Sequence, residues 1–162
     1  MKPNEVKTLK AKKTWFLLPS FKGMMWKGIV YCRKQEDIDV INKSDVIDSD
    51  FKSHETIHIR QALSMKNSWF RFYMNYIWNY LKNLPLLFVN TMAPYMLIPT
   101  EIEAYVHSSD FKYAEKNEPV TQWKVYSDLK LKEKRQIAKN FFKASEKKRF
   151  STVVKEFMKN RN

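Results

Sequence analysis

Five residues of the chain form a motif that can bind a metal ion only if they lie on an α-helix. Residues 54–58 read His-Glu-Thr-Ile-His and contain two of the three histidines of the protein. On an α-helix, residues four positions apart lie on the same face, so the imidazoles of His54 and His58 can reach one zinc ion. Glu55 then lies close enough to take a proton from a water molecule on that ion. The motif therefore predicts a helix with His54 and His58 as metal ligands and Glu55 as general base.

The third metal ligand has to come from elsewhere in the chain, because a catalytic zinc ion usually has three protein ligands and one position open for water. The segment after Pro99 is expected to be helical and carries three candidates. Glu101 and Glu103 point about 200° apart around a helix, so they cannot both face the metal. Glu103 and His107 share a face through their i, i+4 spacing. The residues alone leave Glu101, Glu103 and His107 open.

Two segments together resemble a known family pattern. Residues 54–61 read His-Glu-Thr-Ile-His-Ile-Arg-Gln, and residues 101–105 read Glu-Ile-Glu-Ala-Tyr. This arrangement resembles the gluzincin type of HExxH zinc metallopeptidases, in which a downstream helix supplies a glutamate ligand. It is also similar to a group of small uncharacterised bacterial proteins with H-E-x-x-H-x-x-Q followed by E-x-E-A-Y. The resemblance spans about residues 50–108.

The resemblance implies a zinc-dependent hydrolysis of peptide bonds, with a peptide or protein as substrate. It implies that His54, His58 and Glu101 hold Zn²⁺. Glu103 stays an alternative, because thermolysin-like enzymes use the glutamate directly before an alanine. Related proteases have an aspartate where this chain has Tyr105.

Two features of the implied reaction stay open in the sequence. The oxyanion donor could be one of three side chains, and nothing in the sequence chooses among His107, Tyr105 and Arg60. An edge strand near Ile29–Tyr31 could bind an extended peptide by strand addition.

The scarcity of glycine and cysteine excludes several other classes of site. With only two glycines, the chain cannot form a glycine-rich phosphate loop, so we expect no nucleotide cofactor. Cys32 is the only cysteine, which excludes an internal disulfide and a cysteine zinc cluster and favours a small core residue. No apolar export signal follows the lysine-rich residues 1–13. A cytoplasmic location is therefore expected.

Positive charge gathers near the C-terminus and supports a different function. The chain carries a formal net charge of +13, and residues 124–161 hold thirteen lysines and arginines against four acids. Such a region can bind nucleic acid or an anionic membrane surface, although a solvated basic helix has the same composition. The alternative to a peptidase is thus a non-catalytic basic interaction module.

The pattern of apolar residues predicts a predominantly helical α+β fold. We expect short strands at Trp15–Leu18, Trp26–Lys34 and Asp37–Val40 that form a small antiparallel sheet against the HExxH helix. The predicted division is a basic flexible arm (1–13), a zincin-like domain (14–120) and a basic helical extension (121–162).

Four helices are expected to follow the sheet. The motif helix should begin at a cap on Asp50 or Ser53 and end near Lys66. An aromatic helix should run from Ser68 to Pro85, with its stripe in the core or in a membrane interface. Another should open at Pro99. A C-terminal amphipathic helix is predicted from the spacing of Phe150, Val153, Val154, Phe157 and Met158.

Overall fold

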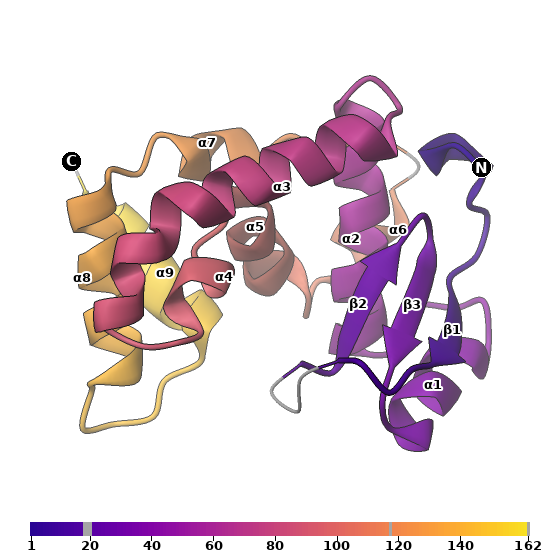
Figure 1. Ribbon diagram of the computed structural model, residues 1–162, viewed down its shortest axis with the longest axis horizontal. Coiled ribbons are helices and arrows are strands. Elements are labelled where there is room, and N and C mark those ends of the chain that lie inside the picture. Colours follow the sequence, from indigo (N-terminus) through magenta and orange to yellow (C-terminus); the bar gives the residue numbers. More distant parts are fainter. Residues whose placement is uncertain (18–20, 117, 162) are drawn as a thin grey trace. The chain divides into compact units, whose positions relative to one another are not determined.

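The computed structural model describes residues 1–17, 21–116 and 118–161, and it confirms a predominantly helical α+β protein with one small sheet (Figure 1). The chain divides into two compact units. The first comprises Met1–Arg71 and His107–Val120, and the second comprises Phe72–Val106 and Thr121–Asn162.

The sheet of the first unit has three strands in the order β1-β3-β2. They are β1 (Lys10–Lys13), β2 (Gly23–Trp26) and β3 (Ile29–Cys32). β2 and β3 pair antiparallel, whereas β1 joins β3 in parallel, so the sheet is mixed and not antiparallel throughout as predicted. Lys27 and Gly28 connect β2 to β3 with φ values of 49° and 82°, and two left-handed residues are typical of a tight hairpin turn.

The expected positions of the strands need several corrections, and the predicted strand Trp26–Lys34 is wrong because the turn at Lys27 and Gly28 separates β2 from β3 within it. Residues 1–13 are not a flexible arm throughout, because they contain the 3-10 helix η1 (Pro3–Glu5) and β1. Residues 15–17 form bends instead of a strand, and Leu18 lies outside the described residues. The predicted edge segment Ile29–Tyr31 belongs to the central strand β3, so the edges of the sheet are β1 and β2.

The expected strand Asp37–Val40 is part of helix α1 (Gln35–Asn42). Ile38 and Ile41 lie one helical turn apart and are both buried, while acidic residues in the first turn suit the positive end of the helix dipole. At the other end of α1, the side-chain amide of Asn42 accepts from the backbone N–H of Ala11 and donates to its carbonyl, at 2.8 and 3.1 Å. This pair of bonds ties α1 to strand β1.

The motif helix is α2 (Asp50–Ser64), which confirms the predicted helix, although its cap lies one residue earlier than expected. The side chain of Ser49 accepts from the backbone N–H of Lys52. Gly23 on β2 lets α2 approach the sheet, because a Cβ there would lie 2.8 Å from the ring of Phe51. Helix α6 (Phe111–Glu115) also packs on α2.

The second unit is helical. It contains most of α3 (Trp69–Asn83), then η2 (Leu84–Phe88), α4 (Ala93–Met96), α5 (Pro99–His107 with its last residue in the first unit), α7 (Trp123–Ser127), α8 (Leu131–Phe142) and α9 (Phe150–Lys159). The helices predicted from Ser68, Pro99 and Phe150 are confirmed. The core of this unit gathers apolar side chains from η2, α4, α5, α8 and α9, including Leu86, Leu97, Ile102, Ile137 and Val154.

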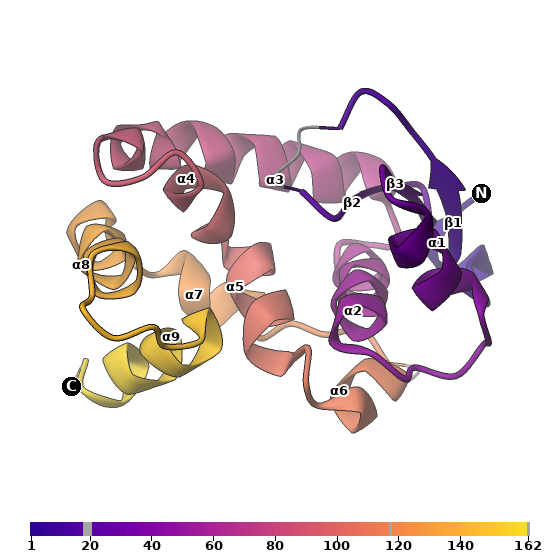
Figure 2. The ribbon, with the colours of Figure 1, turned by 90° about the horizontal axis from the view of Figure 1, so that it is seen from below.

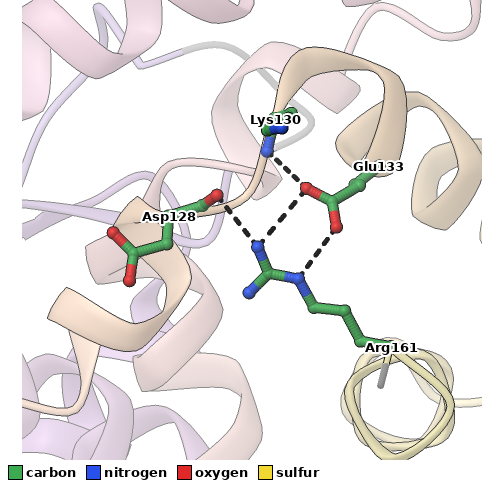
Figure 3. Close-up of polar contacts among 4 residues, drawn as sticks. All are labelled: Asp128, Lys130, Glu133 and Arg161. Carbon is green, nitrogen blue, oxygen red and sulfur yellow. Dashed lines mark hydrogen bonds and ion pairs between the residues drawn. The ribbon is translucent and has the colours of Figure 1, made fainter.

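Helices α8 and α9 lie side by side (Figure 2). Arg161, just after α9, reaches back to the start of α8 (Figure 3). Its Nε donates to Glu133 Oε1 at 2.8 Å, and Nη2 donates to the carbonyl of Asp128 at 3.0 Å. The backbone N–H of Lys130 and then Arg161 lower the pKa of Glu133. This contact fixes the end of α9 against the loop before α8.

Within the described residues, no helix has both the length and the hydropathy needed to cross a membrane.

Candidate metal centre

His54 and His58 occupy one face of α2, one helical turn apart, and both side chains are buried. Their Nε2 atoms lie 3.2 Å apart. The two rings are nearly perpendicular, with an interplanar angle of 88° and centroids separated by 4.8 Å. The predicted pair of ligands is therefore brought together, with one nitrogen of each ring aimed at the other.

Gln61 determines which nitrogen of His58 carries the proton. The Oε1 of Gln61 lies 2.8 Å from Nδ1 of His58, and Gln61 is fully buried one turn further along α2. An amide oxygen only accepts hydrogen bonds, so Nδ1 of His58 donates. The Nε2 of a neutral His58 then carries a lone pair, directed at His54. A metal-binding histidine is commonly oriented in this way by a partner of its second nitrogen.

The distance between the two Nε2 atoms fits two ligands of one zinc ion. Zinc–nitrogen bonds are about 2.0–2.1 Å long, and a tetrahedral angle then separates two ligating nitrogens by about 3.3–3.4 Å. The observed 3.2 Å is close to that separation. A hydrogen bond from Nε2–H of His54 to Nε2 of His58 has a similar length. The two histidines can therefore share either a metal ion or a proton, and a measurement of metal binding distinguishes these two possibilities.

Glu55 lies on the same helix and is buried. The pKa of Cys32 on β3 is raised to about 12, chiefly by burial of the thiol. The negative charge of Glu55 adds to this effect, and that of Asp37 adds less. Cys32 is fully buried and protonated at neutral pH, which agrees with a core residue and not with a nucleophile.

The candidate acidic ligands lie on α5 and have different neighbours in the second unit. Glu101 is buried, and Tyr76 Oη on α3 donates a hydrogen bond of 3.1 Å to its Oε1. Glu103 is also buried, and its charge adds to the effect of burial in raising the pKa of Tyr126 near the end of α7. The two carboxylates thus lie on different sides of α5, as their spacing predicts.

The three candidate oxyanion donors make separate contacts. His107 stacks on Tyr113 of α6, with centroids 3.9 Å apart and an interplanar angle of 13°. Tyr105 packs edge-on against Phe150 in the second unit. Arg60 donates to the backbone carbonyl of residue 118, and burial lowers the pKa of its guanidinium. These contacts do not choose among the three donors.

Two residues gain roles that the sequence did not assign. Gln61 stands three residues after His58, a spacing that places both on one helical face, so local reasoning could have found it. Tyr76 lies within the predicted aromatic helix, whose spacing assigns it no polar partner. Its bond to Glu101 joins residues 25 positions apart in the chain, beyond the reach of local spacing rules.

Comparison of the chain with protein-family models, with curated proteins and with solved structures gave no match.

Proposed function

We propose that the protein is a zinc-dependent metallopeptidase of the gluzincin type, in which His54, His58 and Glu101 hold Zn²⁺ and Glu55 is the general base. The observation that carries the proposal is the buried histidine pair, with Nε2 atoms 3.2 Å apart and His58 oriented by Gln61. A surface pair of histidines would need neither burial nor an orienting amide. The buried pair instead offers two imidazole ligands that already lie side by side, with little further rearrangement needed.

Glu101 is the proposed third ligand, with Glu103 as the alternative. Glu101 is a buried carboxylate on α5, and its place in the Glu-Ile-Glu-Ala-Tyr segment matches the glutamate ligand of the family that the chain resembles. The hydrogen bond from Tyr76 supports this choice, because ligating carboxylates are themselves usually hydrogen-bonded. Two imidazoles and one carboxylate are a donor set that suits catalytic zinc and leaves a position for water.

When bound, zinc would polarise the scissile carbonyl and lower the pKa of a water molecule on the metal. The chain's own contribution to the reaction is proton transfer. Glu55 accepts a proton from the attacking water and delivers it to the leaving nitrogen as the C–N bond breaks, so that the products are a carboxylate and an amine. The substrate is a peptide or protein.

The proposal is tested by comparing the zinc-loaded wild-type protein with a Glu55→Gln variant on a library of quenched fluorescent peptides. Glu55→Gln keeps the size of the side chain and removes the base, so hydrolysis should slow by about 10²–10⁴-fold while bound zinc is unchanged. Addition of a chelator should abolish wild-type cleavage, and zinc should restore it. Equal cleavage rates in the two proteins would refute Glu55 as the base.

The second candidate is a non-catalytic basic module that binds nucleic acid or an anionic membrane through the C-terminal region. The excess of lysine and arginine in α8, α9 and their connection favours it. Two cations of the C-terminal region already have acidic partners, since Lys148 pairs with Glu156 at 3.0 Å and Arg161 with Glu133 at 2.8 Å. Binding to nucleic acid that weakens steeply with rising salt would support the module. Peptide hydrolysis has no such dependence.

A further inference from the structure

Helix α3 has an apolar face that points to solvent. The aromatic stripe expected to lie in the core is largely turned inward, with Trp69 and Phe72 buried and Tyr73, Tyr76 and Tyr80 half-buried. On the other side of the helix, large apolar side chains remain about half exposed, namely Met74, Ile77, Trp78 and Leu81. Their spacing of i, i+3, i+4 and i+7 places them together along one side of α3. We call these four residues the outer face.

The apolar surface continues past the end of α3. Leu84, Leu87 and Phe88 of the adjoining η2 are also exposed, and the side chain of Phe88 is 89% exposed. Large apolar side chains gathered in this way on a protein surface mark an interaction site more often than a structural need. The outer face and η2 therefore need a partner with an apolar component.

The charges around this surface indicate what kind of partner it is. Residues 56–100 contain no aspartate or glutamate, and their charged residues are Arg60, Lys66, Arg71 and Lys82. Lys82 lies beside the outer face, with its Nζ 5.0 Å from the ring centroid of Trp78. Apolar and aromatic side chains bordered by lysine, without acids, are typical of helices that lie in the interface of an anionic bilayer.

The same charges argue against other partners. A second copy of this chain would bring two proteins of net charge +13 together. A nucleic acid would match the charge, but most exposed side chains of the outer face and η2 are aliphatic or contain sulfur, and only Trp78 and Phe88 offer a surface for base stacking. We propose that the outer face of α3 and η2 docks the protein on an anionic lipid membrane, with Trp78 and its neighbours in the headgroup region and Lys82 near the lipid phosphates.

Co-sedimentation of the full chain with lipid vesicles tests the proposal. The wild-type protein should bind phosphatidylcholine vesicles that contain 30% phosphatidylserine, and it should bind pure phosphatidylcholine vesicles more weakly. The double variant Ile77→Gln, Trp78→Gln should lose about tenfold or more in binding to both, because it removes two exposed apolar anchors. Trp15→Gln is the matched control, since Trp15 is a highly exposed tryptophan elsewhere in the chain, and it should bind like wild type.

A charge pair of variants tests where the basic contact lies. Lys82→Glu should weaken binding to the phosphatidylserine vesicles at least about fivefold, because one basic side chain near the bilayer surface contributes about 1 kcal/mol. Lys147→Glu makes the same change in the basic C-terminal region and should have a smaller effect. Absence of vesicle binding by the wild type would overturn the proposal. Full vesicle binding by the Ile77→Gln, Trp78→Gln double variant would also overturn it. If the wild type instead forms a dimer without binding vesicles, and the double variant abolishes that dimer, the outer face is an interface between two copies of the chain and the proposal is wrong.

Discussion

Replacement of Gln61 by leucine tests how the histidine pair is oriented. Leucine is close in size to glutamine, so it fills the buried position but cannot accept the hydrogen bond from Nδ1 of His58, which is 2.8 Å long. A buried donor that loses its partner costs about 1–3 kcal/mol. His58 can avoid that cost by moving its proton to Nε2, and this tautomer cannot bind zinc through Nε2.

The expected result is a loss of zinc affinity of about 10- to 100-fold, the range found when the partner of a metal-binding histidine is removed. The assay is competition for zinc with a chromophoric chelator. Gln61→Glu, which keeps an oxygen acceptor at this position, should restore most of the affinity. Gln136→Leu is the control, because it removes an exposed glutamine that bonds to Asn140 on α8.

A folded Gln61→Leu protein that binds zinc like the wild type would refute the reasoning. Folding is checked separately by urea unfolding in the presence of chelator. This control matters because a general loss of structure would also lower zinc binding.

Three further results are expected. Glu101→Gln should lower zinc affinity at least about tenfold, whereas Glu103→Gln should leave zinc affinity nearly unchanged. The same chelator competition measures both variants. A larger loss of affinity in Glu103→Gln than in Glu101→Gln would make Glu103 the ligand. Cys32, with a pKa raised to about 12 chiefly by burial, should react with a thiol reagent at pH 8 only after unfolding. Burial, with a smaller effect of Lys82, lowers the pKa of Lys134 to about 8. Because the unfolded state then binds more protons between about pH 8 and 10.4, this group should make stability rise with pH over that range. Urea unfolding of the wild type and Lys134→Met should show a free-energy difference that changes with pH across this window, and a constant difference would contradict the shifted pKa.

Local patterns predicted helices α2, α3, α5 and α9, but they missed helix α1 and most of the strand positions. The helices α2, α5 and α9 follow from apolar spacing, from Pro99 and from a polar residue at the start of α2. The segment Asp37–Val40 alternates polar and apolar over only four residues, too short to distinguish a strand from the helix that buries Ile38 and Ile41. Strand β1 contains three lysines and one alanine, so its β structure depends on pairing with β3 and on Asn42, both distant in sequence.

In the candidate site, too, some contacts follow from local sequence spacing and others depend on how distant helices pack. The spacing of His54 and His58 fixes their common face, and the structure confirms that they meet. The contact of Tyr76 with Glu101 depends on how α3 and α5 pack in the second unit, which no local rule gives. The outer face of α3 was not predicted, because almost every side of that helix carries aromatic or apolar residues. The sequence alone therefore did not show which of these side chains are buried and which are exposed.

The most direct test of the central claim is the zinc content of the purified protein after removal and controlled return of metal. The account predicts about one zinc ion per chain in the wild type and in Glu55→Gln, because Glu55 is a base and not a ligand. It predicts almost none in a folded His54→Ala, His58→Ala double variant. No zinc in the wild type, or equal zinc in the double variant, would contradict the claim that this histidine pair is a metal centre.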